Sequence, residues 1–270
     1  MNEGSLEDYA RKLASELGPE EALRRVAAEL FEELKNPFED AERVLCVGPH
    51  PDDCEYGAGG TLAYLARSGK RVVYLILTDG SKGTTSPGVD PRELAEIRRK
   101  EQEEAARIIG VEKVIWLGYP DTELPYTPEA RNSVIRVIRE ERPDVVFSPD
   151  PWLLYEAHPD HRVGGLLAAE AVMLSPLPLV HVGAPHAVKR LVFYYTARPN
   201  FFQPVDGYVD IKLNALRSHR SQFEENWGLF ELYLKTLMAA YGARVGARYA
   251  EPLRVLPATL LHATALSEIV

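Results

Sequence analysis

Histidine and carboxylate residues gather at two places in the sequence, and each set follows an apolar run that is typical of a strand. The first set is His50, Asp52 and Asp53 in PHPDD, which comes directly after the run RVLCVG. The second set is His158 and His161 in HPDH, which follows the run DVVFSP after a short polar loop. Imidazole nitrogens and carboxylate oxygens are ligands that zinc takes in proteins, so these residue types indicate a metal site.

The spacing of these residues gives each a separate role. We expect His50, Asp53 and His161 to bind one metal ion, because three protein ligands leave a fourth position for water, as in catalytic zinc sites. Zinc lowers the pKa of such a water to about 7. Asp52 lies between two ligands and is placed to accept a proton as general base. We expect His158 to be protonated, and either to stabilise an oxyanion or to protonate a leaving amine.

These segments also have simpler interpretations. A single His-Pro-Asp segment is usually only a turn, so it is the pair of segments at two predicted strand ends that favours a metal. Gly57, Gly59 and Gly60 do not complete the dinucleotide pattern G-x-G-x-x-G, which requires glycine where this chain has Leu62. We interpret these glycines as positions where a helix packs closely on a sheet.

Apolar strands and helices alternate around the two segments. We expect strands at 43–48, 71–80, 113–118 and 144–149, and helices at 58–68, 91–110, 127–141 and 160–173. This alternation is typical of an α/β protein with a Rossmann-like, mainly parallel sheet and helices on both faces. Ligands bind beyond the carboxyl ends of the strands in such sheets, so the polar loops after these four strands should converge.

The remaining segments extend this core at both ends. We expect two helices within 5–36, strands at 190–197 and 207–211, and helices near 212–223 and 229–243. We interpret 1–270 as a single domain, with a helical N-terminal extension (1–40), a core (43–225), and a C-terminal helix and tail (226–270).

Composition excludes several classes of protein. The chain has 270 residues, of which 46% are hydrophobic, and a formal net charge of -9. This acidic balance argues against a nucleic-acid partner, and no apolar run reaches membrane length. Cys46 and Cys54 cannot build a disulfide framework, so we expect a cytoplasmic protein. Few Met and Cys with many Arg and Glu also favour a thermophilic source.

The segments PHPDDCEYGAGGT, IRRKEQEEAARIIG, GYPDTE and HPDHR occur in this order over about residues 43–225. They resemble the zinc-dependent N-acetylglucosaminyl deacetylase family (PIG-L, or LmbE-like), and the extensions resemble its archaeal members that act on diacetylchitobiose. The resemblance implies one Zn²⁺ per subunit and hydrolysis of the N-acetyl group of a GlcNAc-type sugar, N,N'-diacetylchitobiose or GlcNAc, with release of acetate. It also implies that Arg98 and Asp121 contact sugar hydroxyls.

Two further residues are candidates for substrate binding. Trp152 lies in a loop near the predicted site, where its ring could pack on a pyranose. The tail 252–270 is apolar, and we expect it to be buried against a neighbouring subunit of a homo-oligomer, a trimer or a hexamer. His262 would then reach the rim of a neighbour's active site. The alternative is that the tail folds back on its own sheet.

Other functions stay open at this point. The protein could deacetylate another GlcNAc conjugate, or could be a metal-dependent phosphoesterase, since clustered His and Asp also hold pairs of metals. A non-catalytic sugar- or dinucleotide-binding module is the third alternative. A metal assay separates this module from the enzymes, and acetate release against phosphate release separates the two hydrolases.

Overall fold

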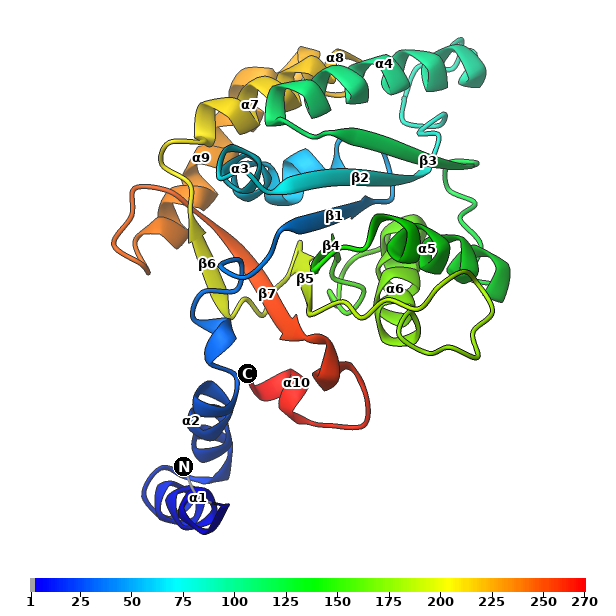
Figure 1. Cartoon of the computed structure of the whole chain (residues 1–270). Helices are drawn as coiled ribbons and strands as arrows, with labels where there is room; N and C mark the ends of the chain where they lie inside the picture. The colour runs from blue at the N-terminus through cyan, green and yellow to red at the C-terminus, as the bar shows by residue number, and fades with distance from the viewer. Residues whose placement is uncertain (1–2) are drawn as a thin grey trace.

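A seven-stranded sheet forms the centre of the computed structural model, which describes residues 3–270 (Figure 1). The strands lie in the order β3-β2-β1-β4-β5-β7-β6. Their bounds are β1 Arg43–Gly48, β2 Arg71–Thr78, β3 Lys113–Tyr119, β4 Val145–Pro149, β5 Arg190–Tyr194, β6 Phe201–Pro204 and β7 Ala250–Pro257. The first five in this spatial order pair in parallel, whereas β7 is antiparallel to both β5 and β6. The predicted mainly parallel α/β fold is therefore confirmed.

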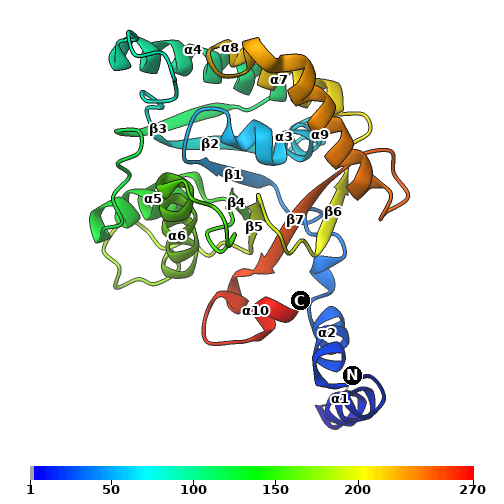
Figure 2. The ribbon, with the colours of Figure 1, turned by 180° about the vertical axis from the view of Figure 1, so that it is seen from behind.

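Helices cover both faces of the sheet (Figures 1 and 2). The helices are α1 Glu3–Leu17, α2 Pro19–Leu30, α3 Asp53–Arg67, α4 Pro91–Ile109, α5 Pro128–Glu141, α6 Pro159–Leu174, α7 Val209–Ser218, α8 Arg220–Phe223, α9 Trp227–Gly242 and α10 Leu266–Ile269. Helices α3, α4 and α7 lie over one face, and α5 and α6 lie over the other.

Alternation along the central strands produces the two layers of core. Val44 and Cys46 of β1 pack into the cluster beneath α3, α4 and α7, whereas Leu45 and Val47 pack into the cluster beneath α5 and α6. Successive side chains of a strand point to opposite faces, so a continuous apolar run fills both layers. β1 is thereby held in the middle of the sheet, and the loop that follows it is fixed.

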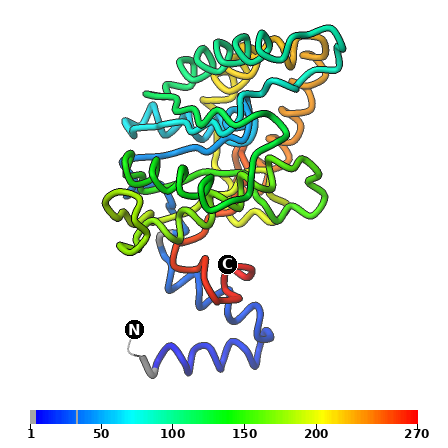
Figure 3. The backbone as a smooth tube through the Cα atoms, turned by 90° about the vertical axis from the view of Figure 1, so that its right-hand side faces the viewer, coloured from blue at the N-terminus to red at the C-terminus, as the bar shows by residue number. Residues whose placement is uncertain are grey.

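The N-terminal helices α1 and α2 project from the body of the molecule (Figures 1 and 3). They pack on each other through a small apolar cluster that includes Leu13, Ala22 and Val26. Helix α2 also touches the C-terminal α10, where Arg24 Nε donates to the carbonyl of Ile269 at 3.1 Å. Within residues 3–270, no helix has both the length and the hydropathy needed to cross a membrane.

The C-terminal half differs from the prediction in three elements. The strand expected at 207–211 is wrong, because α7 begins at Val209. Strands β6 and β7 were not predicted. Leu253 and Val255 of β7 are fully buried within their own chain, so the expected burial of this part of the tail against a neighbour is also wrong. Both strands are short or interrupted by proline, which removes a backbone donor and obscures a strand pattern.

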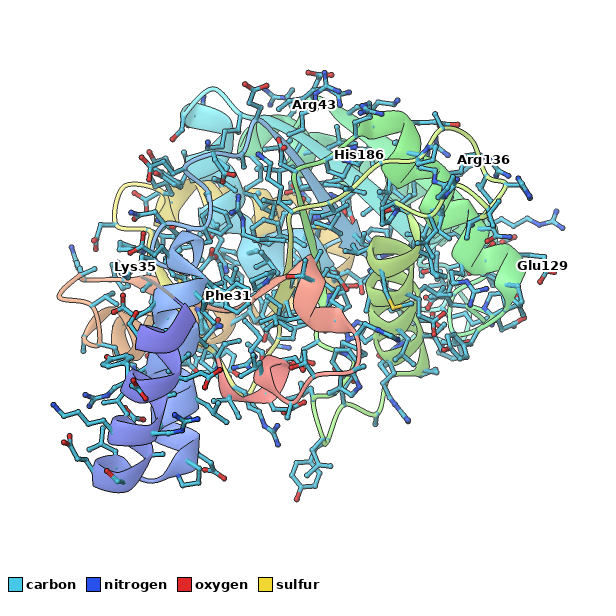
Figure 4. The ribbon with its side chains drawn as sticks, turned by 60° about the horizontal axis from the view of Figure 1, so that its bottom comes forward. Phe31, Lys35, Arg43, Glu129, Arg136 and His186 are labelled. Carbon is cyan, nitrogen blue, oxygen red and sulfur yellow. The ribbon has the colours of Figure 1, made fainter. Side chains whose placement is uncertain are left out.

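The strand order reverses between β1 and β4, since the chain proceeds from β1 to β2 on one side and reaches β4 on the other. The carboxyl ends of β1 and β4 flank this point, where open α/β sheets bind ligands. The opposite, amino edge carries Arg43, the first residue of β1, and His186, whose Nε2 lies 2.7 Å from the carbonyl oxygen of Pro143 (Figure 4). His186 is therefore remote from the predicted site.

Candidate active site

The loops after β1 and β4 bring the two histidine segments together. Asp53 is the first residue of α3, and His161 lies in the first turn of α6. Ring nitrogens of His50, His158 and His161 lie within 4.8 Å of one another. The five residues that the two segments were expected to contribute thus line one pocket, and their separate roles stay predictions.

Asp53 lies between two of the histidines. Its Oδ2 is 3.2 Å from His50 Nδ1 and its Oδ1 is 3.2 Å from His161 Nε2. The side chain is 3% exposed. Burial alone would raise the pKa of Asp53, but the neighbouring His161 and His50 hold it well below its usual range. Two imidazoles and one carboxylate around a buried point are a donor set that fits zinc or a similar divalent metal.

Further carboxylates lie within hydrogen-bonding distance of both of these histidines. His50 Nε2 is 3.1 Å from Asp160 Oδ2 and 3.2 Å from Asp121 Oδ1. His161 Nδ1 is 3.1 Å from Glu156 Oε2. Carboxylates in these positions fix the orientation of a ligand histidine. Sequence reasoning did not find Glu156, for which the only signal is an acid shortly before HPDH.

These carboxylates also change the protonation of the rings. Burial would lower the pKa of His50, but hydrogen bonds to Asp121, Asp160 and Asp53 outweigh it and raise the pKa to about 11. His161 follows the same pattern, with a pKa of about 9 because Asp53 outweighs burial. In the metal-free chain, positive charge on the two rings therefore balances the carboxylates.

Asp52 has a left-handed backbone conformation that residues other than glycine rarely adopt, with φ of 103° and ψ of -25°. Its backbone N–H donates to Gln102 Oε1 at 2.9 Å, and Arg98 Nη2 donates to its Oδ2 at 3.2 Å. Burial raises the pKa of Asp52 to about 6, against the opposing charge of Arg98. The strained turn places the Asp52 carboxylate at the pocket beside Asp53, and its role as general base stays a prediction.

Gln102 and Glu55 form a buried hydrogen-bonded pair that supports this turn. Neither residue was predicted. Gln102 Nε2 donates to Glu55 Oε1 at 2.7 Å, and both side chains are fully buried. Arg98 and Gln102 are four residues apart on α4, on the face that buries Leu94. A polar residue at a position of the apolar face is the signal that could have identified Gln102.

His158 forms the N-cap of α6, and its Nδ1 accepts the backbone N–H of Asp160 at 3.3 Å. Burial, together with the charges of His50 and His161, lowers its pKa. Because Nδ1 accepts this hydrogen bond, Nε2 is the ring nitrogen available for a ligand in the pocket. The protonated His158 expected from the sequence stays a prediction.

Arg98 and Asp121 lie in the cluster but already have protein partners. Arg98 donates to the carbonyls of Pro51 at 2.7 Å and Gly80 at 2.9 Å. Asp121 accepts the backbone N–H of Lys82 at 2.9 Å. Both line the pocket, and their expected contacts with sugar hydroxyls stay predictions.

Trp152 and His262 are not brought to the cluster. They line an adjoining cavity of about 830 Å³ between the loop after β4 and the C-terminal tail. Trp152 is 60% exposed and packs edge-on against Phe193, with ring centroids 5.5 Å apart. Any role of these two residues in substrate binding therefore stays a prediction.

The glycines after the first segment pack as predicted. A Cβ at Gly57 would collide with the ring of Tyr194 on β5. At Gly60, a Cβ would lie 2.9 Å from Val205. The close packing of α3 on the sheet confirms the steric interpretation for Gly57 and Gly60, whereas a Cβ at Gly59 would lie 3.2 Å from Lys212 of α7.

The cluster opens into a cavity of about 880 Å³. One end holds the histidines and carboxylates, and the far side is formed by residues of α9. An α/β fold with such a cluster at the reversal point of its sheet defines a protein with a candidate divalent-metal site in a ligand-sized pocket.

Known proteins share this arrangement of sequence and fold. The model of the family described as "PIG-L: GlcNAc-PI de-N-acetylase" matches residues 45–172. The diacetylchitobiose deacetylase of Thermococcus kodakarensis is 45% identical over 93% of this chain and 97% of its own length. The structure of the N,N'-diacetylchitobiose deacetylase from Pyrococcus horikoshii, complexed with its inhibitor MPG, is 44% identical and has a TM-score of 0.86, with 93% of this chain and 97% of that chain covered. The conserved protein TT1542 from Thermus thermophilus is 36% identical with a TM-score of 0.69, covering 78% and 92%.

The chain therefore belongs to the PIG-L family of de-N-acetylases. The resemblance drawn from the four sequence segments is confirmed.

Proposed function

We propose that this protein hydrolyses the N-acetyl group of a GlcNAc-type amino sugar and releases acetate, with N,N'-diacetylchitobiose as the first substrate to test. The observation that carries this proposal is the convergence of His50, Asp53 and His161, with Asp52 beside them, in a ligand-sized pocket. The similarity to diacetylchitobiose deacetylases along 93% of the chain supports the choice of substrate.

His50, Asp53 and His161 would hold one zinc ion in this proposal. Bound zinc would supply a Lewis acid that polarises the acetamide carbonyl and lowers the pKa of a nearby water. The carboxylates behind the two histidines would keep their rings in the orientation that ligation requires.

Asp52 and His158 would have separate roles, one as the proton acceptor and the other as a hydrogen-bond donor. Asp52 faces the pocket from its strained turn and would accept the proton of the attacking water, then return it to the leaving amine. His158 would donate its Nε2–H to the oxygen on which negative charge develops, since its Nδ1 is occupied by the N–H of Asp160. A general base and a hydrogen-bond donor in one pocket are parts that amide hydrolysis uses.

The phosphoesterase alternative has less support. The second set of grouped ligand atoms among the described residues, His50 with Asp121 and Asp160, shares His50 with the first set. The surrounding carboxylates would also repel a phosphate, whereas a neutral acetamide meets no such barrier.

Acetate release tests the proposal directly. We expect the purified protein, assayed with its metal content measured, to release acetate from N,N'-diacetylchitobiose or GlcNAc and to lose this activity with a chelator. Added zinc should restore it. Phosphate release from phosphomonoesters without any acetate release would overturn the proposal.

We also propose a cytoplasmic homo-oligomer, a trimer or a hexamer, in which His262 reaches the rim of a neighbour's pocket. The location is supported by the free cysteines Cys46 and Cys54. Assembly is supported by exposed apolar side chains beside the second cavity, such as Leu154 and Tyr155. Sedimentation of the intact chain as a monomer at micromolar concentration would rule out the assembly.

A further inference from the structure

Tyr195 directly follows strand β5 and lines the pocket, and its backbone has a left-handed conformation. Its φ is 55°. Residues with a bulky side chain rarely adopt a positive φ, and holding one there costs about 1–3 kcal/mol. Such strain persists only where the surrounding structure fixes it, and it indicates a side chain that is needed in one position.

The hydroxyl of Tyr195 lies against Asp53, one of the three candidate metal ligands. Tyr195 Oη is 3.2 Å from Asp53 Oδ1 and 3.3 Å from the carbonyl oxygen of the same residue. A hydroxyl has one proton to donate, so the two oxygens share it, and both distances exceed the usual value of about 2.7–2.8 Å. The other carboxylate oxygen of Asp53, Oδ2, accepts the backbone N–H of His50 at 2.8 Å. These two donors together orient the Asp53 carboxylate.

The ring of Tyr195 packs on a second candidate ligand. It is nearly parallel to the imidazole of His161, with ring centroids 5.7 Å apart and an interplanar angle of 23°. Its other aromatic neighbours are Tyr56, at 5.1 Å, and Tyr194, which packs edge-on at 4.7 Å. Because the ring of Tyr195 is held by these neighbours, it gives His161 a fixed surface to pack on.

We propose that Tyr195 is a positioning residue of the candidate metal centre, which holds Asp53 through its hydroxyl and His161 through its ring. This inference rests on the metal-dependent function proposed above and extends it to a residue outside the two histidine segments. Tyr195 also lies outside residues 45–172, which the family model matches, and the sequence predicted only a strand at this position. Partners that orient a metal ligand typically change metal affinity by about 10–100-fold.

Zinc affinity tests the role of the hydroxyl and requires no turnover. Tyr195→Phe keeps the ring and removes the hydroxyl, so we expect the Kd for zinc to rise about tenfold. The metal-free protein is titrated with zinc in competition with a chelator of known affinity. With cobalt in place of zinc, the visible spectrum should also differ from that of the wild type, because it depends on the arrangement of the ligands.

The neighbouring tyrosine provides a matched control. Tyr194 is fully buried, and its hydroxyl donates to the carbonyl of Val47 at 2.7 Å, which is not a candidate ligand. Tyr194→Phe therefore also removes one hydroxyl at the end of β5, but the Kd for zinc should stay at the wild-type value. Chemical denaturation of the metal-free proteins measures how much stability each variant loses, so a general loss of structure is separated from an effect on the metal.

A second variant tests the role of the ring. Tyr195→Asn removes both the ring and the hydroxyl, and Asn is among the residues that adopt a positive φ most readily, so the backbone conformation should be retained. We expect a larger rise in the Kd for zinc than in Tyr195→Phe, because His161 also loses the surface on which it packs. If Tyr195→Phe does not fold, Tyr195→Asn takes its place, and a wild-type zinc affinity in that variant would overturn the proposal.

The outcomes separate this proposal from the function on which it rests. Wild-type protein that binds no zinc would overturn the metal centre, and the role of Tyr195 with it. Zinc binding without acetate release from any substrate would refute the deacetylase function alone, and the measured affinities would still decide the role of Tyr195. An unchanged Kd in Tyr195→Phe, or an equal rise in Tyr194→Phe, would overturn the role of the hydroxyl. Equal affinities in Tyr195→Phe and Tyr195→Asn would overturn the role of the ring.

Discussion

The two edges of the parallel sheet use charged residues in opposite ways. At the amino edge, each buried or half-buried acid has a cationic or backbone donor. Glu141 accepts from Arg71 at 2.9 Å and from Lys113 at 2.7 Å. Asp144 accepts the backbone N–H groups of Glu42 and Arg43 at 2.9 and 3.1 Å. Although burial opposes the change, these donors lower the pKa of both acids.

At the carboxyl edge, acids are concentrated around a few histidines and one arginine. The acids of the cluster are Asp52, Asp53, Asp121, Glu156 and Asp160. Charge balance in the metal-free chain depends on protonated His50 and His161, whose pKa values are raised. The same residue types therefore stabilise one edge, whereas at the other they assemble a site that a divalent cation would complete.

Removing a ligand at the carboxyl edge should have the largest effect. We expect His161→Ala to lose most bound zinc and nearly all activity. Loss of an orienting group alone costs about 10–100-fold in metal affinity, so loss of a direct ligand should cost more. Metal content measured by mass spectrometry provides the check, with His186→Ala at the amino edge as the control. Full zinc occupancy in the His161 variant would contradict the assignment.

Removing the proposed base without disturbing the metal should have the second-largest effect on activity. Asp52→Asn keeps the shape of the side chain, so zinc should be retained, but kcat should fall by ~10² or more because the amide cannot accept the proton. Parallel measurement of zinc content and acetate release separates this role from ligation. Near-normal turnover with zinc bound would reject Asp52 as the base.

Removing the side chain that supports the strained turn should have a smaller effect on activity. Gln102→Leu removes the acceptor of the Asp52 N–H, and a strained conformation of this kind costs about 1–3 kcal/mol to hold. We expect kcat to fall about tenfold, the change that roughly 1.4 kcal/mol gives, with little change in KM. Glu103→Leu, at an exposed position of the same helix, is the control. An equal loss in both variants would mean that Gln102 does not position the base.

The carboxyl edge was more predictable than the residues that support it. The two histidine segments follow apolar runs, and parallel strands must bring such loops together, so the parallel pairing of these strands and the convergence of His50 and His161 followed from the pattern. Glu156 and Gln102 act through contacts between loops and helices far apart in sequence. Periodicity along one element does not show such contacts.

Strands β6 and β7 could not be predicted from the sequence for a different reason. Strand β6 has four residues, and β7 contains Pro252, so neither shows the uninterrupted apolar run of β1 or β2. Both depend on pairing with each other and with β5. The apolar character of α9 was visible in the sequence, but only the fold places Tyr233 and Leu237 beside the histidine cluster.

The smallest expected effect lies at the amino edge, on stability rather than activity. Because the pKa of Asp144 is lowered in the folded chain, its contribution to stability is present above the unfolded pKa of about 3.9 and is lost as the pH falls through the folded value. Asp144→Asn should therefore lower the free energy of unfolding by about 1.5–3 kcal/mol at pH 7, the scale of hydrogen bonds to a charged group. The difference from wild type should shrink below pH 4. Chemical denaturation at both pH values measures it, with the exposed Glu140→Gln as control. A deficit that is independent of pH would show that Asp144 acts through shape and not through its charge.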